Sequence, residues 1–230
     1  MKQITYAYLE TTNYCNLACS FCNREEVIGP LKHMSLDNWG KLLDGIKHHP
    51  IEEAKLMGMG EPMLHPQFDE VCRMFKEVFP DCKLIVASNC QYNIKEGLEF
   101  RRKYQECMKY IDILYFSIDG YKEHYERDRA PAKWKKLIKF LEDFKTINRY
   151  DCEVVVNYVV NVYNIYDIEK VDNLRKENNL GRLRLNIAQI WNEDSSITSD
   201  IATSGYSQEQ LSYLKTNWSD NIMGKSKWDF

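Results

Sequence analysis

Six short apolar segments alternate with amphipathic segments along most of the sequence, and this alternation constrains the fold more than any other feature. The apolar segments are rich in β-branched and aromatic residues, as strands are, and lie at residues 4–10, 53–58, 83–88, 111–118, 153–160 and 182–188. Between them apolar residues recur at helical spacing, as at Leu36, Trp39 and Leu43. Apolar strands joined by amphipathic helices predict a parallel sheet covered by helices.

The number of strand–helix units narrows this α/β class. Six units are too few for a closed eight-stranded barrel, so we expect either a partial (β/α)6 TIM-like barrel or an open doubly wound sheet. Residues 192–205 are polar and predict a loop leaving the core, and Leu214 and Trp218 share one face of a short helix after it. We therefore expect a core of residues 1–190 and a C-terminal extension, a loop plus a short helix, of residues 191–230.

Composition excludes several classes of protein. The 230 residues are 44% hydrophobic and 28% charged, as in ordinary soluble domains, and no apolar run reaches the roughly 18 residues of a membrane span. The first residues turn polar too soon for a signal peptide, and a net charge of −3 makes nucleic acid an unlikely partner. Eight cysteines without an export signal indicate a reducing compartment. We expect a cytoplasmic protein without membrane contact.

Three cysteines lie within eight residues of the loop after the first predicted strand. Cys15, Cys19 and Cys22 are spaced CxxxCxxC among polar residues, which offer no apolar face for packed thiols. A structural zinc site takes four ligands, and neither a second CxxC nor a CxxH is present; His33 is a candidate fourth ligand, but its spacing matches no common zinc motif. An iron–sulfur cluster also takes four ligands, so three cysteines would leave one metal position open for a substrate.

The cysteine motif, with Phe21 just before its last cysteine, resembles the signature of the radical S-adenosylmethionine (SAM) enzymes. Three further segments, each at the end of a predicted strand, resemble other motifs of this family in the same order. They are MGMGEP at residues 57–62, SNC at 88–90 and SIDG at 117–120. The resemblance extends over residues 4–190 and implies a partial (β/α)6 barrel.

The resemblance also implies roles for individual residues. Cys15, Cys19 and Cys22 would bind a [4Fe–4S] cluster whose fourth iron is chelated by the amino and carboxylate groups of SAM. A carboxylate at Glu61 suits the methionine ammonium, and the planar donors of Arg129 suit the methionine carboxylate. The residues expected around SAM are Phe21, Gly58, Met59, Gly60, Glu61, Ser88, Asn89, Ser117, Asp119, Arg129, Asn157 and Ile187.

The implied reaction is reductive cleavage of SAM, with an electron from a donor such as flavodoxin or ferredoxin. The resulting 5′-deoxyadenosyl radical would take a hydrogen atom from a small-molecule or peptide substrate. The sequence most resembles the SPASM and twitch-type branch, but it lacks that branch's auxiliary-cluster cysteines, since none follows Cys152. We expect biosynthetic tailoring of a peptide, sugar or aminocyclitol by epimerisation, rearrangement or dehydrogenation.

Cys90 lies in the loop after the third predicted strand, where the family usually has glycine. If the reaction is an epimerisation, a thiol here would return a hydrogen atom to the substrate; the alternative is an ordinary loop residue. Two non-catalytic interpretations also stand, a zinc-stabilised binding module and a degenerate member that binds SAM without cleaving it. A glycyl-radical-activating enzyme is a further alternative.

Overall fold

The computed structural model describes residues 4–92, 98–147, 149–187 and 206–223. The chain divides into two compact units, and each is described by itself. The first consists of Met1–Asn16, Arg24–Phe116 and Lys135–Val154. The second consists of Leu17–Asn23, Ser117–Trp134 and Val155–Phe230. The cysteine loop therefore contributes Cys15 to the first unit and Cys19 and Cys22 to the second.

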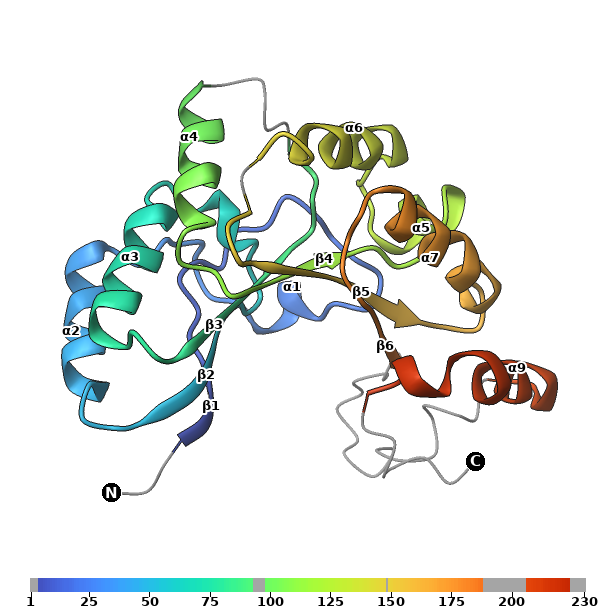
Figure 1. The fold of residues 1–230 in the computed structure, drawn as a ribbon, viewed down its shortest axis with the longest axis horizontal. Helices are drawn as coiled ribbons and strands as arrows, with labels where there is room; N and C mark the ends of the chain where they lie inside the picture. Colours follow the sequence, from blue (N-terminus) through green and yellow to red (C-terminus); the bar gives the residue numbers. More distant parts are fainter. Residues whose placement is uncertain (1–3, 93–97, 148, 188–205, 224–230) are drawn as a thin grey trace. The chain divides into compact units, whose positions relative to one another are not determined.

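Six strands correspond to the six apolar segments of the sequence (Figure 1). They are β1 (Ile4–Tyr8), β2 (Ile51–Leu56), β3 (Lys83–Ser88), β4 (Ile113–Ser117), β5 (Glu153–Val160) and β6 (Leu183–Ile187). Their order in the sheet is β1-β2-β3-β4-β5-β6, and the pairings within each unit are parallel. A doubly wound sheet would reverse its strand order at a switch point, so the predicted partial (β/α)6 barrel is confirmed.

Helices lie between these strands in the sequence, and another follows β6. They are α1 (Arg24–Val27), α2 (Leu36–Ile46), α3 (Phe68–Val78), α4 (Leu98–Cys107), α5 (Glu123–Asp128), α6 (Trp134–Phe144), α7 (Ile168–Glu177) and α9 (Gln208–Trp218). Short 3-10 turns are η1 (Pro62–Leu64), η2 (Ile165–Asp167) and η3 (Ser219–Asn221). The side chain of Ser35 caps α2 by accepting from Asn38 N at 3.2 Å, because serine satisfies one of the unpaired N–H groups at a helix start. No helix of the described residues is long and apolar enough to cross a membrane.

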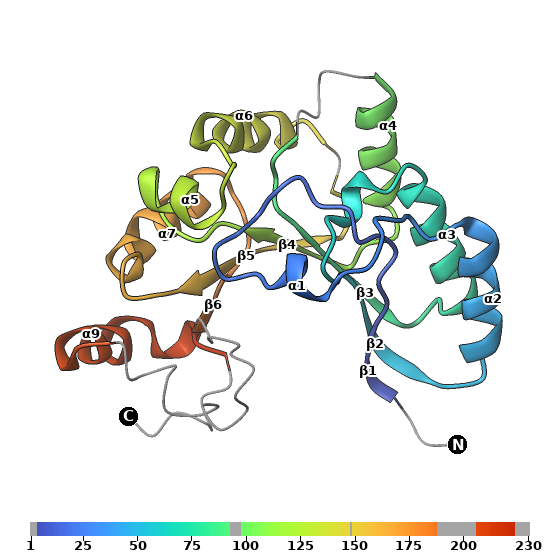
Figure 2. The same cartoon turned by 180° about the vertical axis from the view of Figure 1, so that it is seen from behind.

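In the first unit, side chains alternate between the two faces of β1–β4. One face is completely buried, and its members are Ala54, Leu56, Leu84, Val86, Leu114 and Phe116. The other face carries Tyr6 and Tyr8, which are 57% and 66% exposed. Helices α2 and α3 lie side by side along β1–β3 in both views (Figure 2). The first face therefore forms the helix-covered core, and the second is exposed and aromatic at the edge strand β1 but buried at Ile51 and Ile85 of the inner strands.

A cluster of buried aromatic rings joins the end of β4 to α6 in the first unit. The ring of Phe116 lies 5.2 Å from that of Phe140 and 4.8 Å from that of Phe144. Tyr92 contacts Phe140 edge to face at 5.3 Å, and Tyr104 lies 6.0 Å from the same ring. Because edge-to-face pairs add to the energy of area burial, this cluster supports the strand end from which the next loop leaves.

We expect Phe116→Ala to lower the free energy of unfolding by about 3–5 kcal/mol, because it removes a fully buried ring and leaves a cavity. Urea unfolding of the metal-free protein followed by circular dichroism measures this loss. Leu31→Ala is the matched control, since Leu31 is 46% exposed and should change the midpoint little. An equal effect of both changes would contradict the assignment of this cluster to the core.

In the second unit, the C-terminal extension is attached to β5 and β6. The Tyr206 hydroxyl donates to Val160 O at 2.9 Å, and Gln210 Nε2 donates to Val162 O at 2.9 Å. After α9, Met223 N donates to Leu185 O at 3.0 Å, so this segment pairs in parallel with β6. Helix α9 lies in this segment. The loop expected at 192–205 lies outside the described residues, and the boundary at residue 190 stays a prediction.

Candidate active site

The four family-like segments follow the carboxyl ends of β1, β2, β3 and β4. In parallel α/β folds these ends carry the chemistry. The first unit holds the loops after β2 and β3 together with Cys15, and the second holds the loop after β4 together with Cys19 and Cys22. The candidate residues of each unit are therefore described separately.

In the first unit, the loop after β3 is hydrogen-bonded to the beginning of the cysteine loop. Asn89 Nδ2 donates to Asn16 Oδ1 at 2.7 Å and also lies 3.8 Å from Cys15 Sγ. Asn16 Nδ2 in turn donates to Gln91 O at 2.9 Å. Asn89 is buried, and its N–H groups are of the kind that tune the electronic properties of a sulfur ligand. The predicted site residue Asn89 thus orients the first predicted cluster ligand.

Glu61 is buried and connects three loops of the first unit. Its Oε2 accepts from Asn89 N at 2.7 Å, and its Oε1 accepts from Met63 N at 3.3 Å. Its own N–H donates to Tyr14 O at 2.7 Å. A carboxylate that accepts backbone N–H groups is well satisfied in a buried position. The structure therefore gives Glu61 an organising role in addition to the ammonium contact expected from the sequence.

Glu10 is a residue of this half that sequence reasoning missed. Its Oε1 accepts from Met59 N at 2.5 Å and from Gly60 N at 3.3 Å. A Cβ on Gly58 would lie 2.4 Å from the same oxygen, so glycine leaves the room that the carboxylate occupies. Glu10 and Met59 are 49 residues apart in the sequence, and no local sequence pattern predicts a hydrogen bond over that distance.

Gly60 lies where two loops of the first unit approach closely. A Cβ at this position would be 2.1 Å from Thr12 O and 2.8 Å from Tyr14 O. Real Cβ atoms do not approach backbone oxygens so closely, so any side chain would push the two loops apart. The requirement for glycine here is one of space.

We expect Gly60→Ala to lower the free energy of unfolding by about 1–3 kcal/mol, as overpacking does, and to weaken SAM binding by displacing the loop. Gly45→Ala is the matched control, because a Cβ at Gly45 in α2 meets nothing within 4 Å, and alanine favours a helix over glycine by up to about 1 kcal/mol. Urea unfolding and calorimetric SAM titration measure both effects. If Gly60→Ala behaved like Gly45→Ala, the close approach of the loops would be refuted.

Cys90 and Tyr92 lie in the loop after β3, which ends at Ser88. Cys90 is fully buried with a φ of 59°, in the left-handed region that costs a side chain about 1–2 kcal/mol. Its N–H donates to Ser88 Oγ at 3.1 Å, and its Sγ lies 3.7 Å from Ser88 O. Ser88 Oγ is also hydrogen-bonded to the Tyr92 hydroxyl, whose pKa is raised by burial. The backbone is the one a glycine would adopt, and a hydrogen-donating role for Cys90 stays a prediction.

In the second unit, Arg129 is the centre of the candidate site. Its Nε donates to Asp119 Oδ2 at 2.5 Å, and its Nη1 lies 3.9 Å from Cys19 Sγ. Its guanidinium carbon is 5.6 Å from the centroid of the Phe21 ring. Burial lowers the pKa of Arg129, but the Asp119 carboxylate outweighs this and raises it. Asp119 also accepts from Val159 N at 2.7 Å. A permanent cation therefore lies beside a predicted cluster ligand.

The remaining predicted residues are less closely connected. Ser117 is buried at the end of β4, and Asn157 on β5 accepts from Asn186 Nδ2 at 2.7 Å. Ile187 ends β6, and its side chain lies outside the described residues.

The chemistry of the thiols suits an iron–sulfur cluster. All eight cysteines are reduced, and Cys22 is exposed while Cys15 and Cys19 are partly exposed. Three thiols on one loop, with amide or guanidinium N–H groups beside two of the sulfurs, are a donor set for such a cluster. Across the described residues, no three His, Cys, Asp or Glu side chains are gathered as a metal-binding group. Coordination by these three cysteines therefore stays a prediction.

The sequence matches the family model of the Radical SAM superfamily over residues 9–175. The chain belongs to this superfamily, and its cofactors are a [4Fe–4S] cluster and SAM. The resemblance read from the motifs is confirmed.

The chain is also similar to particular known proteins. The chain is 29% identical over 152 residues to the tungsten-containing aldehyde ferredoxin oxidoreductase cofactor-modifying protein of Pyrococcus furiosus, covering 61% of this chain and 40% of that protein. It is 27% identical over 179 residues to the antilisterial bacteriocin subtilosin biosynthesis protein AlbA of Bacillus subtilis, covering 74% and 37%. SuiB of Streptococcus suis, solved bound to precursor peptide SuiA, has a similar fold, with a TM-score of 0.69, 16% identity, and coverage of 96% of this chain and 49% of that one. The chain thus spans less than half the length of each.

Proposed function

We propose that this protein cleaves SAM reductively at a [4Fe–4S] cluster held by Cys15, Cys19 and Cys22, and that it modifies a peptide by radical chemistry. The observation that carries the proposal is the loop of three reduced thiols, with Asn89 and Arg129 directed at two of its sulfurs. When bound, the cluster and SAM supply one-electron cleavage of SAM and a radical that takes a hydrogen atom from the substrate. We propose a small electron-transfer protein such as flavodoxin or ferredoxin as the reductant.

Residues of the chain bind and orient SAM in this proposal. Arg129 has five N–H donors, of which Nε is used by Asp119, so other donors suit the carboxylate of SAM. The Glu61 carboxylate accepts from Met63 N and Asn89 N, which fix its orientation, and its negative charge suits the methionine ammonium of SAM. Met59 and Gly60 precede Glu61 in the sequence, and Glu10 accepts hydrogen bonds from their backbone N–H groups.

Two lines of support favour a peptide as substrate. The names of AlbA and of the SuiB complex concern the biosynthesis of a bacteriocin and a precursor peptide. At the β1 edge of the first unit's sheet, Tyr6 and Tyr8 are exposed, and Lys55 Nζ lies 3.2 Å from the Tyr8 hydroxyl and 4.9 Å from the rings of both tyrosines. Such an edge offers hydrogen bonds and ring contacts to a polar chain. A sugar or an aminocyclitol is the alternative substrate.

Anaerobic reconstitution tests the cluster and the chemistry together. We expect about four irons and four sulfides per chain, and dithionite-reduced protein incubated with SAM should release 5′-deoxyadenosine. Replacing Cys15, Cys19 and Cys22 together by alanine should abolish both, whereas Cys82→Ala, which removes a buried thiol elsewhere, should preserve them. A colourless protein that retains zinc would instead support a binding module, and SAM binding without 5′-deoxyadenosine a degenerate member.

Two substitutions test the proposed hydrogen-donating role of Cys90. Cys90→Ala and Cys90→Gly both remove the thiol, and glycine also adopts a φ of 59° without strain. Both variants should still release 5′-deoxyadenosine, while the peptide product made in deuterated water should lose the solvent-derived deuterium that the unmodified enzyme introduces. Product of normal yield and deuterium content from Cys90→Gly would return Cys90 to the ordinary loop residues.

A further inference from the structure

A short segment of the second unit runs along the cysteine loop. Asp128 O accepts from Ser20 N at 2.9 Å and from Ser20 Oγ at 3.4 Å. Ala130 O accepts from Ala18 N at 2.7 Å. These bonds hold the backbone on both sides of Cys19. The position of Cys19 therefore depends on where the segment from Asp128 to Ala130 is held.

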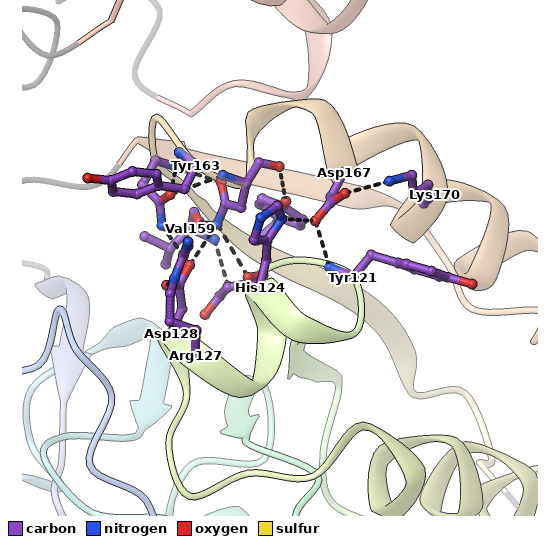
Figure 3. A network of polar contacts seen from close by, with 12 residues as sticks. Tyr121, His124, Arg127, Asp128, Val159, Tyr163, Asp167 and Lys170 are labelled. Atoms are coloured by element: carbon purple, nitrogen blue, oxygen red, sulfur yellow. Dashed lines mark hydrogen bonds and ion pairs between the residues drawn. The ribbon is translucent and has the colours of Figure 1, made fainter.

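The side chain of Asp128 holds that segment. The residue is 3% exposed, and burying a carboxylate costs a great deal unless donors replace its water. Arg127 Nε donates to Oδ1 at 2.6 Å, and Asn161 Nδ2 donates to Oδ2 at 2.8 Å (Figure 3). The ring of Tyr163 lies 4.7 Å from the Arg127 guanidinium. The carboxylate thereby attaches the segment to the loop that follows β5.

Asn164, in the same loop, connects this network to Asp119, which pairs with Arg129. It is completely buried, and its Nδ2 donates to Val159 O at 2.9 Å and to Asp119 O at 3.3 Å. It also lies 3.4 Å from Asp128 Oδ2. The loop after β5 thus holds both the segment beside Cys19 and the backbone carbonyl of Asp119.

We propose that Asp128 is a positioning residue for the cluster, which fixes Cys19 through Ser20 without itself contacting cluster or SAM. The inference rests on the proposed cluster site and assigns the orientation of one of its ligands to Asp128, for which the resemblance implies no role. Only a carboxylate fits the network, because each of its oxygens accepts from a neighbouring donor. An asparagine would turn an N–H group toward Arg127 or Asn161.

Alkylation of the metal-free protein by iodoacetamide tests this directly. In Asp128→Asn we expect Cys19 to be alkylated about tenfold faster, the effect of losing one charge-assisted hydrogen bond, while Cys15, in the other unit, serves as the internal reference. Asp172→Asn is the matched control. Asp172 is a buried carboxylate of the same unit that pairs with Arg175 at 2.7 Å and Lys176 at 2.6 Å, and its loss should leave the ratio of Cys19 to Cys15 unchanged.

A second variant guards against a folding defect in the first. Asn161→Asp keeps the Oδ1 that accepts from Tyr163 N at 2.9 Å but replaces the donor to Asp128 with a like charge. It should raise the alkylation of Cys19 as Asp128→Asn does, and the reduced, reconstituted variants should show an altered electron paramagnetic resonance spectrum of the cluster. An unchanged ratio of Cys19 to Cys15 in either folded variant, or an equal rise at all thiols, would overturn the proposal. Because alkylation needs no cluster or SAM, its result is independent of the test for SAM cleavage.

Discussion

Removing a guanidinium and a carboxylate from water costs several kcal/mol for each ion, and only their mutual attraction with further hydrogen bonds offsets this cost. Arg129 and Asp119 meet under these conditions, at 8% and 0% side-chain exposure. Several residues of the second unit form hydrogen bonds or close contacts with this ion pair. Val159 donates to the carboxylate, Asn164 holds its backbone, and the guanidinium extends to Phe21 and Cys19. A substitution at either ion would leave its partner buried and charged, so the pair must be retained or lost as a whole.

In the first unit, carboxylates are instead paired with backbone N–H groups of the loops. Glu10 and Glu61 accept N–H groups from the loops after β2 and β3, and Asn16 adds a further bond to the loop after β3. Gly60 is needed because the loops touch, and Gly58 leaves room for the Glu10 carboxylate. The carboxylates that bind the loops and the glycines that allow the close approach therefore act together.

The fold was predictable to a large extent because its determinants are local. Apolar runs and helical spacing lie within single segments, and all six predicted strands are present. The cluster loop was recognisable because its three thiols are neighbours in the sequence. Glu10, Asp128 and Asn161 could not be found in this way. Each acts on a segment distant in the chain, and an acidic residue or an amide in a loop is, by its sequence alone, an ordinary solvated side chain.

The pairing of Met223 with Leu185 has a consequence for the behaviour of the protein in solution. The outermost strand of an open sheet presents a row of backbone donors and acceptors, and such a row is a template for association with other chains. The segment after η3 covers part of that row on β6. The C-terminal extension thus blocks part of the β6 edge from pairing with strands of other molecules. A chain shortened before Tyr206 would expose the β6 edge and tend to self-associate, even with an intact catalytic core.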